Sequence, residues 1–143
     1  MTQYNNIYVD MVGDLFHGNH VRLLKEAKTY GNNLLLGLHS DEEVEKYKKK
    51  KPILNVFERA EIIESCKYVD KIITLNAPTI ICEEFLNKYN IDLVIHAHNE
   101  HEKIYDSMFA IPIKLNKFKR IDYHPGISTT EIKKRIIEKN EIS

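Results

Sequence analysis

The chain alternates between two kinds of apolar pattern, and this alternation is the feature that most restricts the folds open to it. Short runs rich in Leu, Ile and Val are typical of buried strands, whereas the stretches between them repeat their apolar residues at helical spacing. We expect strands at Ile7–Val12, Asn33–His39, Lys71–Leu75, Ile91–Ile95 and Ile111–Leu115. We expect helices over Asn19–Tyr30, Asp41–Tyr47, Asn55–Tyr68 and Pro78–Tyr89, and a last helix from Ser128 onward.

Strands and helices that alternate with short loops predict β-α-β units, and therefore a parallel sheet with helices on both faces. Right-handed crossovers between about five such strands give a doubly wound, Rossmann-like α/β fold, which binds ligands at the carboxyl ends of its strands. The 143 residues contain no repeat, linker or shift in composition, so we expect residues 1–143 to form a single domain. Residues after Ile137 are polar, and we expect them to fray.

Composition and charge exclude several classes of function. Lys plus Arg is 21 and Asp plus Glu is 21, so the chain lacks the basic excess expected of a nucleic-acid-binding protein. No apolar run approaches the ~18–20 residues that span a bilayer, and Met1–Asn6 is too polar for a secretory signal. Cys66 and Cys82 match no metal spacing and are too few for a disulfide framework, so we expect a cytoplasmic protein with reduced cysteines.

The first expected strand-to-helix junction carries two histidines. His17 precedes the helix and His20 lies in its first turn. Free N–H groups at a helix N-terminus bind anions, and imidazole N–H groups can follow charge that develops on a phosphate. Gly13 and Gly18 would let the backbone approach such a ligand closely. The alternative is that His20 belongs to the apolar face of the helix and that His17 is an ordinary loop residue.

A second candidate anion site lies where the last expected helix begins. The segment reads Gly126-Ile127-Ser128-Thr129-Thr130-Glu131, and its hydroxyl and backbone N–H groups gather at a helix start. The alternative is that Ser128 simply caps the helix, with Glu131 completing a capping box. Two such helix starts in one small sheet indicate a polyphosphate ligand more strongly than either does alone.

These two junctions resemble those of the cytidylyltransferase family of nucleotidyltransferases, especially the members that act on phosphoethanolamine, phosphocholine and glycerol 3-phosphate. The resemblance rests on His17-Gly-Asn-His20 and Gly126-Ile-Ser-Thr-Thr130, and shorter matches in the same order extend it over nearly the whole chain. They are His39-Ser-Asp-Glu-Glu43, Glu58-Arg-Ala60, Cys66-Lys-Tyr-Val-Asp70, Ala77-Pro78, Glu83-Glu-Phe-Leu86 and Ile91-Asp-Leu-Val-Ile-His96. The chain departs from the family at Asn19, where the family has glycine, and at Tyr123, where it has a phosphate-binding arginine.

The resemblance implies an enzyme that transfers CMP from CTP to a small phosphorylated or phosphonylated molecule and releases pyrophosphate. It also implies Mg²⁺ bound through the triphosphate, and a homodimer. The implied catalytic residues are His17, His20 and Lys48. The implied nucleotide-binding residues are Val12, Gly13, Asp14, Phe16, Arg59, His96, Asn99, Arg120, Gly126, Ile127, Ser128, Thr129 and Thr130. Among these, Arg120 is the candidate to replace the family's arginine, because it lies three residues before Tyr123.

Other interpretations of the same features stay open. We interpret the neighbours of Lys48 in the run Lys46–Lys51 as a solvated surface. His96, His98 and His101 have a spacing that could hold a metal ion, although contact with the nucleotide or substrate is favoured. For the whole chain, the alternatives are an adenylyltransferase of the same fold, a non-catalytic nucleotide-binding module suggested by the two departures, and an unrelated flavodoxin-like domain.

Overall fold

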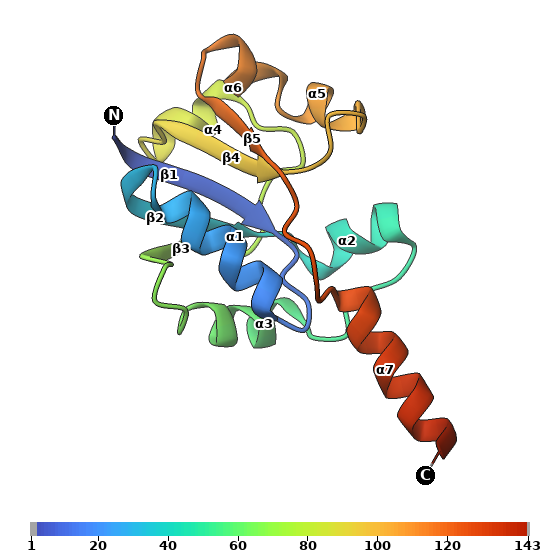
Figure 1. The fold of residues 1–143 in the computed structure, drawn as a ribbon. Coiled ribbons are helices and arrows are strands. Elements are labelled where there is room, and N and C mark those ends of the chain that lie inside the picture. Colours follow the sequence, from blue (N-terminus) through green and yellow to red (C-terminus); the bar gives the residue numbers. More distant parts are fainter. Residues whose placement is uncertain (1–2, 143) are drawn as a thin grey trace.

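Five parallel strands form the centre of the computed structural model, which describes residues 3–142 (Figure 1). The strands are β1 (Tyr4–Met11), β2 (Gly31–Leu38), β3 (Lys71–Thr74), β4 (Leu93–Ala97) and β5 (Phe118–Ile121), in the spatial order β3-β2-β1-β4-β5. The helices are α1 (Gly18–Lys28), α2 (Asp41–Lys48), α3 (Val56–Ile63), α4 (Glu83–Lys88), α5 (Ile104–Met108), α6 (Ala110–Lys114) and α7 (Thr129–Ile142). The predicted Rossmann-like α/β sheet is confirmed.

The central strand β1 is buried on both faces because helices cover both sides of the sheet. It pairs in parallel with β2 over Tyr4–Met11, and with β4 at Ile7 and Tyr8. One face packs into a core that includes Ile7, Val9, Leu24, Ala27, Leu34, Leu36 and Ile63. The other face packs into a second core of Tyr8, Ile81, Leu86, Ile91, Val94 and Phe109. Strands buried on both faces are continuous apolar runs, which is why β1 and β2 were recognisable in the sequence.

The expected fifth strand is wrong. Ile111–Leu115 lies mostly in α6, and the edge strand is β5, which begins at Phe118. A short apolar run is compatible with a buried strand or a short helix, and periodicity alone does not separate the two. Pro112 suits the first turn of a helix, where its missing N–H costs nothing. Asn116 then takes a left-handed conformation, with φ of +56°, as the chain turns into β5.

Helix boundaries also differ from those expected. The third helix ends at Ile63 and not at Tyr68, the fourth begins at Glu83 and not at Pro78, α5 was not predicted, and α7 continues to Ile142 without fraying after Ile137. The expected N-caps at Ser40, Asn55 and Ser128 are confirmed, because each side-chain oxygen accepts a hydrogen bond from the backbone N–H three residues later.

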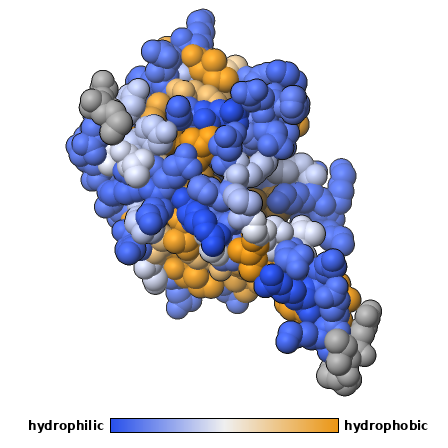
Figure 2. Space-filling model, viewed as in Figure 1, coloured by the Kyte–Doolittle hydropathy of each residue, from blue (hydrophilic) through white to orange (hydrophobic). Residues whose placement is uncertain are grey.

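The last helix, α7, projects from the body of the molecule at the carboxyl edge of the sheet (Figure 1). Its visible face is mostly hydrophilic (Figure 2), and the side chains of residues 133–140 are all exposed. None of the helices in residues 3–142 is long and apolar enough to cross a membrane. Cys66 and Cys82 are free thiols.

Candidate functional site

A cavity of about 700 Å³ lies at the carboxyl ends of β1 and β4. The chain winds in opposite directions from these two neighbouring strands, and doubly wound folds bind ligands at such a point. The volume is typical of sites for small molecules. The lining includes twelve of the predicted site residues: Val12, Gly13, Asp14, His17, His20, Lys48, His96, Gly126, Ile127, Ser128, Thr129 and Thr130.

His17 and His20 cap the start of α1 with one nitrogen each. The Nδ1 atom of His17 accepts a hydrogen bond from the Asn19 N–H at 3.2 Å, and the Nδ1 atom of His20 accepts one from the His17 N–H at 3.1 Å. A neutral imidazole whose Nδ1 accepts must carry its proton on Nε2. The capping box therefore fixes both rings in the tautomer that keeps Nε2–H as a donor.

The same surroundings keep both rings neutral. Burial, followed by the charge of His17, lowers the pKa of His20 from 6.5 to about 4. Burial also lowers the pKa of His17, with a further contribution from Arg22. Phe16 was predicted to bind the nucleotide, but it lies behind His20, with the two rings stacked at a centroid distance of 5.3 Å. Two neutral imidazoles thus present Nε2–H donors at one edge of the pocket, and that of His17 faces the Thr129 hydroxyl.

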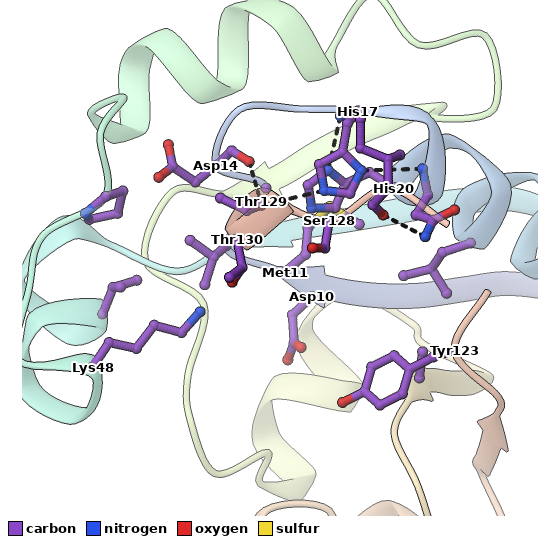
Figure 3. Close-up of a pocket in the computed structure, with 18 of the residues that line it drawn as sticks. Asp10, Met11, Asp14, His17, His20, Lys48, Tyr123, Ser128, Thr129 and Thr130 are labelled. Carbon is purple, nitrogen blue, oxygen red and sulfur yellow. Dashed lines mark hydrogen bonds between the residues drawn. The ribbon is translucent and has the colours of Figure 1, made fainter. Parts of the chain in front are cut away.

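The start of α7 lies against these histidines, although 112 residues separate Thr129 from His17. The hydroxyl of Thr129 donates to the Asp14 carbonyl at 3.1 Å and lies 3.3 Å from the Nε2 atom of His17 (Figure 3). Ser128 caps the helix through the Glu131 N–H. The two candidate anion sites of the sequence therefore form one site.

Asp14 positions the loop on the other side of the pocket. One of its carboxylate oxygens accepts from the Ile53 N–H at 2.8 Å, and the other accepts from the Leu54 N–H at 2.9 Å. Both oxygens are therefore occupied by backbone groups. This arrangement ties the loop after α2 to the loop after β1.

Lysines line the pocket where that loop passes it. Lys48 extends into the pocket from the end of α2 (Figure 3), and its charge contributes to the lowered pKa of His20. Lys50 and Lys51 also line the pocket, although both are exposed, as expected of a solvated surface. Lys133 of α7, which we did not predict, joins them. The lysine run was visible in the sequence, but which of its side chains face the pocket depends on the turn that the chain makes at Lys49.

The opposite wall combines one carboxylate with aromatic rings, and sequence reasoning missed most of it. Asp10 is 6% exposed and lines the pocket together with His96, Tyr105 and Tyr123. Tyr123 donates to Glu102 at 3.1 Å, and burial together with this bond raises its pKa to about 12. A signal was available for Asp10, since it lies near the carboxyl end of β1, where ligands bind in such sheets.

The structure does not bring the three histidines near β4 together as one group. The Nδ1 atoms of His96 and His98 lie 3.0 Å apart, and both rings contact Tyr105. Within residues 3–142, no three His, Cys, Asp or Glu side chains are arranged to hold a metal ion. Burial lowers the pKa of His96 to about 4, so its ring faces the pocket uncharged.

Arg59 does not reach the pocket, which corrects its predicted contact with the nucleotide. Its side chain is 0% exposed, and its guanidinium donates to the carbonyls of Val12 at 2.6 Å and His39 at 2.9 Å. It also donates to the Leu54 carbonyl at 3.1 Å and to the Asp41 carboxylate at 2.7 Å. Arg59 therefore holds together the backbone that surrounds the site.

Arg120 and Asn99 also lie outside the lining of the pocket. Arg120 donates to the His98 carbonyl at 2.8 Å, to Asp122 at 2.7 Å and to Glu100 at 3.3 Å. The Asn99 N–H donates to Glu102. The cations that face the pocket are lysines and not Arg120, so the structure does not support Arg120 as the replacement for the family's arginine.

Comparison with known proteins confirms the resemblance. Residues 13–135 match the family model described as cytidylyltransferase-like. The chain is 34% identical to an ethanolamine-phosphate cytidylyltransferase of Arabidopsis thaliana, over 94% of this chain and 33% of the relative. It is also 34% identical to choline-phosphate cytidylyltransferase 2 of the same plant, over 92% of this chain and 44% of the relative. The chain thus spans less than half the length of these relatives.

A solved structure shares the fold. The lipopolysaccharide core biosynthesis protein from Thermoplasma volcanium superposes with a TM-score of 0.68 at 21% identity, over 85% of this chain and 98% of that protein. The family model covers both helix starts that line the pocket, from Gly13 to Arg135. The chain belongs to the cytidylyltransferase-like family.

Proposed function

We propose that the protein transfers CMP from CTP to a small phosphorylated molecule and releases pyrophosphate. The observation that carries the proposal is the convergence of two helix N-termini, two neutral histidine donors and a row of lysines on one cavity. This combination suits a ligand with several adjacent phosphates. The family membership and the names of the relatives favour CTP as that ligand.

In the proposed reaction, an oxygen of the acceptor's phosphate attacks the α-phosphorus of CTP as the bond to the β-phosphate breaks. The acceptor is already an anionic nucleophile, so the protein needs only to position the reactants and stabilise charge. The Nε2–H groups of His17 and His20 donate to phosphate oxygens as negative charge moves toward the leaving pyrophosphate. Lys48 and the start of α7 at Ser128–Thr130 bind the triphosphate.

The pocket fits Mg²⁺ that is held mainly by the triphosphate and water. Of the two aspartates in the lining, Asp14 has both oxygens occupied by backbone N–H groups, and Asp10 lies 3.6 Å from His39 Nε2. We therefore assign neither carboxylate to the ion. Mg²⁺ commonly keeps several waters and binds one or two carboxylates plus substrate phosphates. When bound, the ion neutralises phosphate charge.

We propose an acceptor with a cationic head group, such as phosphoethanolamine or phosphocholine. Asp10 offers negative charge in the pocket, and the rings of Tyr105 and Tyr123 offer faces that attract an ammonium group. The names of the two plant relatives support this choice. The homodimer and the cytoplasmic location stay predictions.

A pyrophosphate-release assay tests the proposal. It crosses the four nucleoside triphosphates with phosphoethanolamine, phosphocholine and glycerol 3-phosphate. We expect turnover with CTP and an amino-alcohol phosphate. His17→Ala and His20→Ala should each lower turnover by about 10²–10³-fold, the usual loss for a donor aimed at developing charge. His101→Ala is the matched control, because His101 is exposed and lies outside the lining.

The outcomes separate the alternatives. Preference for ATP over CTP would identify an adenylyltransferase. Binding of CTP without release of pyrophosphate from any acceptor would support a non-catalytic module. Normal turnover in both His17→Ala and His20→Ala would refute the assigned roles of the histidines.

A further inference from the structure

The loop of residues 122–127 brings the start of α7 into the pocket, yet its own backbone gives it little support. The pairing of β5 with β4 ends at Ile121. Across the part of the chain that the structure describes, no backbone–backbone hydrogen bond involves residues 122–127. Four of these six residues are exposed. Segments with so few contacts open easily, so side chains from elsewhere must hold this loop in place.

Asn19, in the first turn of α1, supplies two of these contacts. Its Nδ2 group donates to the His124 carbonyl at 2.9 Å and to the Ile127 carbonyl at 2.6 Å. Its Oδ1 atom accepts from Arg22. An amide has two donor hydrogens, and both are used here on the loop. The reverse orientation would place the amide oxygen against two carbonyl oxygens, so the network fixes the orientation of the side chain.

A second contact from α1 reaches the same loop. The Nε2 atom of His124 lies 2.9 Å from the Glu26 carboxylate, two turns further along α1. Between the two carbonyls held by Asn19, Gly126 has a φ of +112°, a conformation that favours glycine. A Cβ atom at Gly126 would lie 3.9 Å from Asn19 Oδ1, so the loop passes close to the amide. The loop is therefore fixed to α1 before it enters α7.

We propose that Asn19 is a positioning residue, which fixes the start of α7 relative to His17 and His20. This inference rests on the proposed function, because it assigns the two helix starts to one triphosphate. A loop that is ordered before binding saves the ligand the cost of ordering it. Asn19 therefore acts on nucleotide affinity through the loop, and not on the chemical step.

The sharpest test is Asn19→Asp. The new side chain has the same shape and keeps an oxygen for Arg22, but it loses both donors and places a negative charge against two carbonyl oxygens. Loss of two hydrogen bonds of ordinary strength corresponds to about tenfold weaker binding of CTP. We expect the KM for CTP to rise about tenfold while kcat stays within about twofold. The NMR order parameters of the Gly126–Ser128 backbone amides in the free protein should fall from the value of a rigid backbone, about 0.85, to below about 0.6, the range of a flexible segment.

The control is Asn33→Asp. The Asn33 side chain also donates a hydrogen bond, to Asn6 at 3.1 Å, but it lies outside the pocket lining. Asn33→Asp should leave both the KM and the order parameters at Gly126–Ser128 unchanged. If Asn19→Asp does not fold, Asn19→Ala removes the same donors without adding charge and should give the same two changes.

Two results would overturn the inference: order parameters at Gly126–Ser128 that stay as high as in the wild type, or a fall in kcat with an unchanged KM. If the wild-type protein releases no pyrophosphate, the proposed function fails, but the order parameters still decide whether Asn19 orders the loop. The two failures are therefore distinguishable.

Discussion

His20 performs a structural and a chemical task with different atoms of one ring. Its Nδ1 atom completes the capping box of α1, and its face stacks on Phe16, which contacts the core. Its Nε2–H group stays available at the pocket. The sequence offered the buried face and the anion site as alternatives, and the structure is compatible with both because the two nitrogens of an imidazole can serve different partners.

Acidification should destabilise the protein through its buried histidines, and His96 gives a measurable example. Burial is the main cause that lowers its pKa to about 4, opposed by Asp10 and assisted by His98. Because the unfolded chain binds a proton near pH 6.5, the stability contributed by neutral His96 is complete above that pH and is lost as the pH falls toward 4. Between pH 7 and pH 4, the melting temperature of His96→Asn should therefore fall less than that of the wild type. Parallel curves for the two proteins would contradict this assignment.

Arg59 should matter for stability and not for direct contact with a ligand. Its removal leaves the Asp41 carboxylate and three carbonyls without their donor. Breaking a buried ion pair from one side costs about 3–5 kcal/mol. We expect Arg59→Met to lower the free energy of unfolding by that order in urea titrations. Arg120→Met is the comparison, since Arg120 forms its ion pairs with exposed carboxylates and its loss should cost clearly less. An equal loss in both variants would contradict the structural role of Arg59.

At the scale of residues, the sequence predicted which residues lie near the site better than it predicted where their side chains point. His17, His20 and Thr129 were predicted because a helix start orients its groups in a known way. Arg59 and Arg120 were placed in the site because they matched or neighboured a motif. Neither spacing nor resemblance shows whether a long side chain points toward a cavity or into the backbone behind it, and here both point away.

At the scale of elements, strong local signals predicted the structure and weak ones did not. The capping residue Asn55 forms its reciprocal bonds with Glu58 as expected, because capping depends on neighbours three residues apart. The segment Ile111–Leu115 carried no such signal, and its packing against the second core decides its conformation. β5 contains Lys119 and Arg120 at the edge of the sheet, so its pattern is too polar to identify from periodicity.

The turn after α2 determines which lysines face the pocket. Lys49 caps the helix in a left-handed conformation, with φ of +64°, and the chain then carries Lys50 and Lys51 past the cavity. The double variant Lys50→Ala, Lys51→Ala should weaken CTP binding by at least about tenfold and make the affinity less sensitive to salt. Calorimetric titration at two salt concentrations measures both effects. Lys46→Ala is the control, because Lys46 pairs with Glu43 outside the lining, and an equal effect there would indicate a general loss of positive charge.

For the whole molecule, the site and the body of the fold are largely separate. The two cores lie on the faces of the sheet, whereas the cavity lies at its carboxyl edge. The location of the site at the carboxyl edge of the sheet was predictable from the doubly wound topology alone. The convergence of α1 and α7 at that edge was implied by the resemblance, which assigned both helix starts to one nucleotide, but its geometry depends on the path of residues 122–127 between β5 and α7.

This separation predicts that α7 contributes to ligand binding much more than to stability. The side chains of residues 133–140 are exposed, and Thr129 provides the hydrogen bonds of α7 to the Asp14 carbonyl and to His17. A chain that ends at Ile127 should therefore melt within a few degrees of the full chain. A chain that ends at Arg135 keeps Ser128–Lys133 and serves as its matched control.

Addition of CTP should distinguish the two truncated chains. A ligand at about 100 times its Kd stabilises the folded state by about 2.7 kcal/mol, which corresponds to a rise of about 5–10 °C for a chain of this size. We expect this rise in the full chain and in the chain that ends at Arg135, with a smaller rise for ATP at the same concentration. The chain that ends at Ile127 should show almost none, because it lacks the second helix start. A full rise there would mean that the phosphates bind to α1 and the lysines alone, and early melting without ligand would mean that α7 supports the sheet.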